Sequence, residues 1–282
     1  MTRQRRAIGI TLLLVGVIAF VTAGVENVGG IFSIGTSARA LGLGGAFCAL
    51  ADDEAAAFHN PAGLSWYKGI GLSSLFVQQF GGIAYGTVTV ALPYVGFSVA
   101  LLDSGPISTG DGSFRYASQG VSASFGVPVG PVGIGGRWRF FRVSSPMSGQ
   151  GWVLDPALIV VTETVRIGLL FEGLISSPMA YESGAEEAFG QSLRLGAALK
   201  LEPTRGVSWN ASFEASGLFT ALAQLAAGLE AWIGAVGARV GFDGQGPTFG
   251  LSIRFDTLEI DWAYASRNDL GDSHRVALSL RF

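Results

Sequence analysis

The chain has 282 residues, of which 42 are glycine and one is cysteine, and 14% of them are charged. Its 18 basic and 21 acidic residues give a formal net charge of −3, and they do not form the Lys/Arg clusters of a nucleic-acid-binding surface. The mean hydropathy of +0.44 is high for a soluble enzyme. After the N-terminus, however, no run of about 18 uncharged apolar residues appears, which argues against a polytopic helical membrane protein.

The N-terminus has the order of a secretory signal peptide. Three arginines within the first six residues precede an apolar stretch over residues 7–20, and Val21-Thr22-Ala23 offers small residues for cleavage. We therefore predict that residues 1–23 are removed on export. The alternative, an uncleaved inner-membrane anchor, is disfavoured because no basic stop-transfer cluster follows the apolar stretch.

Residues 24–68 show no regular alternation of apolar and polar side chains. The acidic run Asp52-Asp53-Glu54 precedes several alanines, where it would cap a short helix or form an inward salt bridge. Pro61 should end any such helix near His59, so that Asn60-Pro61-Ala62-Gly63-Leu64 forms a rigid turn. This segment is therefore expected to be a short helical and loop-like unit, distinct from residues 69–282.

From residue 69 onward the dominant signal is a period of two, which is typical of strands with two different faces. In the last segment, Val276, Leu278 and Phe282 share one face, while Arg275 and Arg281 share the other. Fourteen segments carry this pattern, strongly or weakly: 71–80, 83–92, 95–103, 114–127, 132–143, 152–161, 165–172, 193–201, 207–214, 222–233, 236–243, 249–255, 258–264 and 275–282.

The links between these segments alternate in character. Every second link is tight, such as Pro93-Tyr94 or Asp256-Thr257, whereas several of the others are longer, such as 104–113, 144–151 and 176–190. Tight turns on one rim and longer loops on the other are typical of outer-membrane barrels. The pattern predicts an all-β fold, a transmembrane antiparallel β-barrel of about 14 strands over residues 69–282. An even strand number places both chain ends on the periplasmic side.

A barrel must close, because an open sheet edge in hydrocarbon leaves backbone groups without hydrogen-bond partners. Charged residues on the strands should then face the lumen, and this prediction applies to Arg137, Arg139, Arg166, Glu172 and Arg194. A secreted soluble β-sandwich is the structural alternative. It is disfavoured because the apolar faces carry Trp, Phe, Leu and Ile in segment after segment. The terminal Phe282 resembles the recognition signal read by the β-barrel assembly machinery.

The run ARALGLGGAFCALADDEAAAFHNPAGLSW, residues 38–66, resembles the N-terminal motif of the FadL-like outer-membrane proteins, and most closely their PorV/PorQ branch. The resemblance implies a fourteen-stranded barrel whose lumen holds residues 24–68 as a hatch. By this resemblance Asn60, Pro61 and Ala62 match the hatch motif, with Phe58 beside it. Arg39, Asp52 and Asp53 match its polar positions. The chain is much shorter than FadL and has little room for large extracellular loops.

The sequence contains no convincing catalytic or metal-binding constellation. His59 lies in the predicted hatch turn and His274 opens the last strand, and neither has the surroundings of an outer-membrane hydrolase. Cys48 and two distant histidines do not make a zinc site, and the acidic run lacks a calcium-loop pattern. A phosphate-binding loop follows a strand, whereas no predicted strand precedes Gly42-Leu43-Gly44-Gly45. We predict no enzymatic activity, no cofactor and no metal.

These features predict a protein of the bacterial outer membrane, embedded in outer-membrane lipid and binding no nucleic acid. The resemblance to FadL implies a passive conduit for small hydrophobic molecules such as fatty acids, opened when the hatch shifts. The resemblance to PorV/PorQ implies the alternative, a non-conducting scaffold that binds a secretion-system protein. The sequence does not decide between the two.

Overall fold

The computed structural model describes residues 31, 34–79, 83–109, 112–144, 147–221, 223–266 and 272–282. The predicted signal peptide, residues 1–23, lies outside these ranges, as does the first part of the predicted hatch segment, residues 24–30. Within the described ranges, no helix has the length and apolar character needed to cross a bilayer.

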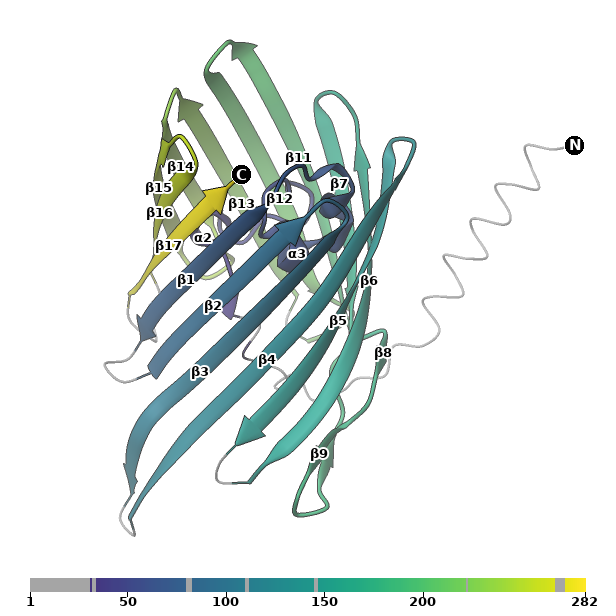
Figure 1. Cartoon of the computed structure of the whole chain (residues 1–282), viewed down its shortest axis with the longest axis vertical. Coiled ribbons are helices and arrows are strands. Elements are labelled where there is room, and N and C mark those ends of the chain that lie inside the picture. Colours follow the sequence, from purple (N-terminus) through teal and green to yellow (C-terminus); the bar gives the residue numbers. More distant parts are fainter. Residues whose placement is uncertain are drawn as a thin grey trace, which may run out of the picture.

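The dominant structure is a closed antiparallel barrel of fourteen long strands (Figure 1). Strand β17 closes it by pairing with β1, from Gly71↔Arg281 to Phe76↔Val276. The predicted all-β barrel is therefore confirmed, and the sandwich alternative is wrong. The strands are β1 Gly71–Gln79, β2 Ile83–Leu92, β3 Val95–Thr109, β4 Gly112–Val129, β5 Val132–Ser144, β6 Gly149–Val161, β7 Val165–Glu172, β11 Ser192–Thr204, β12 Val207–Leu218, β13 Gln224–Ile233, β14 Val236–Phe242, β15 Pro247–Phe255, β16 Leu258–Ala265 and β17 Ser273–Arg281.

The two rims of the barrel differ. At the tight-turn rim the strands are joined by short turns such as 93–94, 205–206 and 256–257. At the opposite long-link rim, the connection between β7 and β11 carries three short strands, β8 Ile175–Ser176, β9 Met179–Tyr181 and β10 Glu186–Glu187. In Figure 1 the β3–β4 hairpin projects furthest at the long-link rim, and the β11–β12 hairpin rises at the other end.

One predicted loop is wrong. Residues 104–113 were expected to connect two strands irregularly, but β3 and β4 stay paired from Pro106↔Arg115 to Thr109↔Gly112. The register shifts between Asp103 and Pro106, where Gly105 adopts a φ of 62° that favours glycine. The Gly-Pro pair therefore marks a β-bulge rather than the end of the strand.

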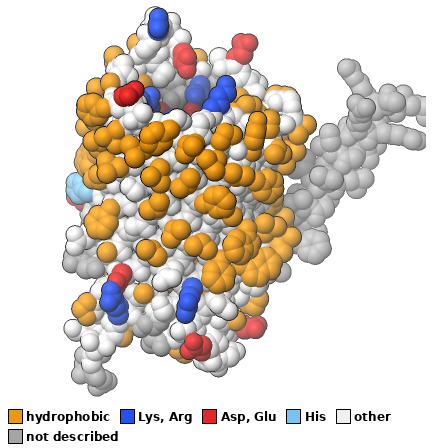
Figure 2. Space-filling view, viewed as in Figure 1, with side chains coloured by type: hydrophobic (Ala, Val, Ile, Leu, Met, Phe, Trp, Pro, Cys, Tyr) orange, Lys and Arg blue, Asp and Glu red, His pale blue; other side chains and the backbone are white. Residues whose placement is uncertain are grey.

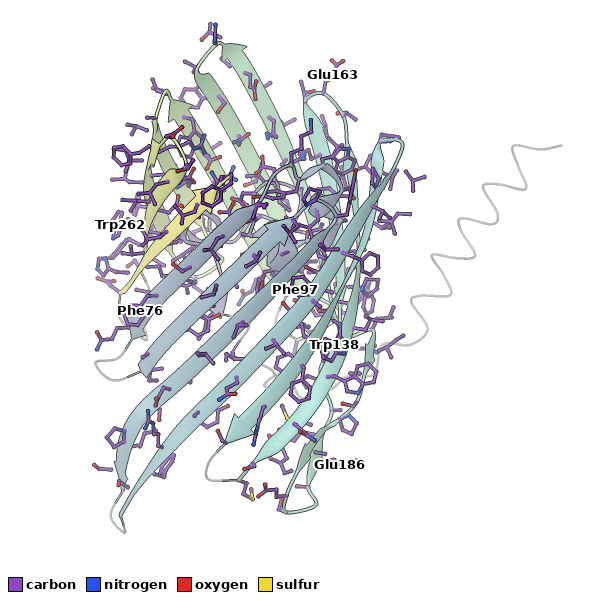
Figure 3. The ribbon with its side chains drawn as sticks, in the orientation of Figure 1. Phe76, Phe97, Trp138, Glu163, Glu186 and Trp262 are labelled. Carbon is purple, nitrogen blue, oxygen red and sulfur yellow. The ribbon has the colours of Figure 1, made fainter. Side chains whose placement is uncertain are left out.

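The outer surface of the barrel is apolar and its interior polar, as a membrane-spanning barrel requires. Figure 3 shows Phe76, Phe97, Trp138 and Trp262 on the outside of their strands, with Glu163 and Glu186 at opposite ends of the molecule. Figure 2 shows the same arrangement as an apolar band bordered by charged side chains on both sides. The five predicted inward charges are buried or half-buried, and each forms a salt bridge: Arg137, Arg139, Arg166, Glu172 and Arg194.

The hatch, residues 34–68 of the described chain, fills the middle of the lumen. It contains α2 Ala38–Gly42, α3 Ala56–His59 and the 3₁₀ helix η2 Pro61–Trp66, and most of its side chains are buried. Pro61 ends α3 as predicted, but residues 60–64 form the start of η2 rather than a turn. The acidic run makes no side-chain cap on α3, whose N-cap is Ala55. It forms salt bridges instead.

Glycines on the inner wall receive the backbone of the hatch. A Cβ atom at Gly135 would lie 2.6 Å from the Ala62 nitrogen, and one at Gly228 would lie 2.6 Å from the Leu43 oxygen. At Gly168 it would overlap the Cys48 carbonyl. The small inward residues therefore hold the hatch in close contact with the wall on several strands.

Candidate functional site

Arg39 is the centre of the largest polar cluster in the hatch. From α2 it donates two hydrogen bonds to Glu230 of β13, at 2.7 and 2.8 Å. The same guanidinium contacts Asp52 at 2.7 Å and Asp53 at 2.8 Å. Arg39 therefore ties two distant parts of the hatch to one another and to the barrel wall.

The wall supplies further partners to this cluster. Glu230 also accepts hydrogen bonds from Asn210 at 2.6 Å and from Arg239 at 2.5 Å. Arg239 in turn contacts Asp261 at 3.2 Å. A buried charge is tolerated when it is paired and hydrogen-bonded in this way, and removing one member leaves the others uncompensated.

The two aspartates of the cluster have opposite electrostatic environments. Burial would raise the pKa of Asp52, but Arg39 and Lys200, the latter at 2.5 Å, hold that pKa well below its usual range. Burial raises the pKa of Asp53 to about 7 against the attraction of Arg39, and the neighbouring Glu54 adds to the rise. Asp52 is therefore the permanent anion of the pair.

A second cluster lies on the other side of the hatch. Arg137 of β5 contacts Asp155 at 2.9 Å and Glu172 at 3.3 Å, and it donates a hydrogen bond to the Phe58 carbonyl. Its guanidinium also lies 4.9 Å from the centre of the Phe58 ring. Arg194 extends the cluster from Glu172 to Glu214.

Glu214 connects this second cluster to the hatch backbone. Its carboxylate accepts hydrogen bonds from the amides of Phe47 at 3.0 Å and Cys48 at 2.8 Å. A third contact joins Glu54 to Arg281 of β17 at 2.8 Å. Charged wall residues thus hold the hatch at several separate places, which also include the contacts of Arg166 with the Leu50 carbonyl and of Arg275 with the Ile34 carbonyl.

Asn60 links separate stretches of the hatch, and 0% of its surface is exposed. Its amide nitrogen donates to the carbonyls of Cys48 at 2.8 Å and Leu158 at 3.2 Å, and its oxygen accepts from the Ala62 amide at 3.1 Å. Pro61 starts η2 behind it, where its lack of an N–H costs nothing. The Asn-Pro-Ala motif therefore joins two stretches of the hatch to β6.

Two cavities flank the hatch. A vestibule of about 930 Å³ opens at the tight-turn rim and is bordered by Arg39, Asp52, Asn210 and Trp232. An inner cavity of about 160 Å³ lies on the opposite side and is bordered by Leu41, His59, Glu214 and Ala226. The hatch separates the two, so the described barrel is plugged.

His59 lies beside the inner cavity. Burial lowers the pKa of His59 to about 3, and the charges of Arg194 and Arg137 add to the effect. Its ring packs against Phe47 and Phe58, with centroids 5.3 and 5.4 Å away. The imidazole is therefore neutral at physiological pH.

A packed apolar cluster lies inside the barrel on the long-link side of the hatch. Side chains from several strands and from the β7–β11 connection form it with Ile31, the first described residue: Leu75, Val77, Tyr85, Phe141, Val153, Met179 and Phe189. Buried polar side chains of the barrel wall lie beside the cluster, among them Ser118, Ser273 and Arg275.

The predicted hatch residues thus fall into separate groups. Arg39, Asp52 and Asp53 meet in one cluster, Phe58 lies in the second, and Asn60, Pro61 and Ala62 pack on β4 to β6. Phe282 exchanges backbone hydrogen bonds with Ile70 at 2.9 and 3.0 Å, and its side chain is 71% exposed. Among the described residues, no group of three His, Cys, Asp or Glu could hold a metal ion.

The sequence analysis missed the wall residues of these clusters, which bind the hatch directly or bind its wall partners: Lys200, Glu214, Glu230, Arg239, Glu259, Asp261 and Arg281. A usable signal exists for some of them. Glu230 follows Ala226 and Gly228 on one face of its strand, while Leu225, Leu229 and Ile233 occupy the other. A single acid on the small-residue face of such a strand points into the lumen.

Comparison with known proteins finds similarity in fold. No family model matches the sequence, and no curated protein does. Among solved structures, the monoaromatic hydrocarbon channel CymD aligns with a TM-score of 0.59 and 12% identity over 92% of this chain and 99% of its own. The P. putida toluene transporter TodX aligns with a TM-score of 0.55 and 13% identity over 88% and 99%. The chain therefore has the barrel fold of these channels.

Proposed function

We propose that this protein is a passive conduit of the bacterial outer membrane for small hydrophobic molecules such as fatty acids. The observation that carries the proposal is the apolar cluster inside the barrel on the long-link side of the hatch. A hydrophobic molecule that leaves water for apolar surroundings is stabilised by a free energy of about 25 cal/mol per Å² of apolar surface buried.

The outer surface supports a location in the membrane. Apolar side chains cover the outside of the strands, and charged side chains border this band at both rims (Figure 2). We assign the tight-turn rim, which carries the C-terminal Phe282, to the periplasm and the long-link rim to the exterior. The apolar cluster inside the barrel then lies on the exterior side of the hatch, where a hydrophobic solute arrives.

The descriptions of two proteins with a similar fold agree with this proposal. CymD is described as a monoaromatic hydrocarbon channel and TodX as a toluene transporter. The inner cavity adds a feature of this chain, because apolar Leu41 and Leu170 border it together with the ion-paired side chains of Arg137, Glu172, Arg194 and Glu214. Mixed apolar and polar surroundings suit an amphipathic molecule such as a fatty acid.

A second candidate function is a PorV/PorQ-like scaffold that binds a secretion-system protein and conducts nothing. The observation in its favour is the tight seating of the hatch, which separates the vestibule from the inner cavity. Affinity capture from native outer membranes tests it. A reproducible protein partner would support the scaffold, and repeated capture without one would sink it.

The conduit is tested by entry of a fluorescent fatty acid into vesicles with a lipopolysaccharide outer leaflet, which slows spontaneous crossing. We expect faster entry with the folded barrel than in protein-free vesicles. Heat-denatured protein is the matched control. Entry no faster than in either control contradicts the conduit.

A further inference from the structure

The vestibule and the inner cavity approach each other along β12 and β13. On β12, Asn210 borders the vestibule and Glu214 borders the inner cavity, with the buried Ser212 between them. On β13, Trp232 borders the vestibule and Ala226 borders the inner cavity. A short stretch of wall therefore separates the two spaces at this side of the barrel.

The wall along this stretch is lined by small residues and by one acid. Gly228 and Glu230 lie between the two cavity-lining residues of β13. The hatch covers both: Leu43 rests its backbone on Gly228, and Arg39 binds Glu230 through two hydrogen bonds. We call residues 37–46 the hatch arm, because this part makes the seal.

The opposite part of the hatch is fixed more firmly. Residues 60–66, which we call the hatch anchor, pack their backbone on Gly126, Gly133 and Gly135 of β4 and β5. Asn60 is fully buried and bonded to β6. The anchor also continues within a few residues into β1, so the barrel itself holds its end.

Both cavities border the hatch arm. The inner cavity touches Ser37, Ala40 and Gly44, and the vestibule touches Arg39. Residues 60–65 of the anchor border neither cavity. Displacement of the arm therefore joins two existing spaces, whereas displacement of the anchor requires new space to open against β4 and β5.

We propose that the route through the barrel opens between the hatch arm and strands β12 and β13, with the Arg39–Glu230 contact as the closing element and residues 60–66 as a fixed anchor. This inference rests on the proposed function in one respect, namely that the hatch must move for a solute to pass. It assigns the gate to Arg39 and Glu230 rather than to Asn60, Pro61 and Ala62.

Thiol reactivity tests this assignment without any transport measurement. In the full-length protein with Cys48→Ala, which removes the free buried cysteine, one reporter is Ser212→Cys under the arm. The second reporter is Ser65→Cys, a buried residue of the anchor itself that faces Gly133 of β5. Each is combined with Glu230→Gln, and separately with Glu54→Gln, which weakens a comparable hatch–wall contact to Arg281 at 2.8 Å.

A hydrophilic maleimide then reports which part of the hatch moves. We expect Glu230→Gln to raise the labelling rate at Ser212→Cys by about tenfold or more, because it removes the anion that Arg39 and Arg239 share and so breaks the charged contact between the hatch arm and β13. The rate at Ser65→Cys should stay unchanged, and Glu54→Gln should change the Ser212→Cys rate less than about twofold. Heat-modifiable migration shows that each barrel is folded, and Arg39→Gln provides the same test if Glu230→Gln does not fold.

Three results would overturn the assignment. They are an unchanged rate at Ser212→Cys in both gate variants, an equal rise at Ser65→Cys, or an equal effect of Glu54→Gln. Failure of the proposed function gives a different result, since a barrel that carries no lipophile can still show the arm-specific rise in labelling. The two proposals can therefore fail independently.

Discussion

Arg39 in the hatch and Glu230 in β13 lie 191 positions apart in the sequence and share two hydrogen bonds, at 2.7 and 2.8 Å. Arg39 brings two aspartates of the hatch to this contact, and Glu230 brings Arg239 and Asn210 of the wall. This pair therefore connects the plug to the barrel on the stretch of wall that both cavities border.

The two sides of this contact should differ in their effect on stability. Glu230→Leu removes the anion that Arg39 and Arg239 share and leaves them only the carboxylates of Asp52, Asp53 and Asp261, and we expect the free energy of unfolding to fall by about 3–5 kcal/mol. Arg39→Met should cost less, because Glu230 keeps Arg239 at 2.5 Å. Urea unfolding in detergent measures both, and an equal or larger loss for Arg39→Met would contradict this arrangement of charges.

The glycine contacts predict where the wall tolerates a methyl group. Gly168→Ala places a Cβ against the Cys48 carbonyl, and overpacking of this kind costs about 1–3 kcal/mol. Gly86→Ala of β2 is the matched control, since its nearest neighbour would be 3.8 Å away. Thermal unfolding of the two variants should separate them clearly. Equal melting temperatures would show that the hatch does not press on β7.

Asn60 should be sensitive to a change of one atom. Asn60→Asp replaces the donor amide by an acceptor, which then faces the carbonyls of Cys48 and Leu158. A buried polar group without its hydrogen bond costs about 1–3 kcal/mol, so the hatch should loosen. Limited proteolysis of the folded barrel measures this as faster cleavage between residues 34 and 68. Cleavage at the wild-type rate would show that the hydrogen bonds of Asn60 do not hold the hatch in place.

His59 gives a pH dependence with a defined sign. Its folded-state pKa of about 3 lies below the ordinary value near 6.5, so the unfolded chain binds more protons between these values. The stability contributed by neutral His59 is complete above about pH 6.5 and is lost as the pH falls toward 3. Between pH 7 and 5 the loss is on the order of 2 kcal/mol.

The comparison with His59→Gln isolates this contribution from other titrating groups such as Asp53. Unfolding measured at pH 7 and pH 5 should show a larger loss in the wild type than in the variant. A loss of the same size in both proteins would mean that His59 is protonated in the folded state.

Much of the barrel could be predicted from the sequence, because lipid on one side and a polar lumen on the other impose alternation on each strand. Arg137, Arg166 and Arg194 were placed inward on this basis, and each is salt-bridged inside. The extension of the β3–β4 hairpin over residues 104–113 could not be predicted, because Gly105 and Pro106 are compatible with both a loop and a bulge.

The residues that the hatch contributes to the candidate site could be predicted, but those of the barrel wall could not. Arg39, Asp52 and Asp53 were selected in the hatch, and they meet there. Their partner Glu230 could not be assigned, because pairing over such a sequence distance depends on the register of the strands and on the path of the hatch. For the same reason the role of Gly228 as a contact for Leu43 is visible in the structure alone.

The most direct measurement of the central claim is the simultaneous entry of a fluorescent fatty acid and of a small sugar into the same proteoliposomes. The account predicts protein-dependent entry of the lipophile with no entry of the sugar, because an apolar cluster lies inside the barrel and the hatch separates the vestibule from the inner cavity. Entry of the sugar at a porin-like rate, or no entry of the lipophile through a folded barrel, would contradict it.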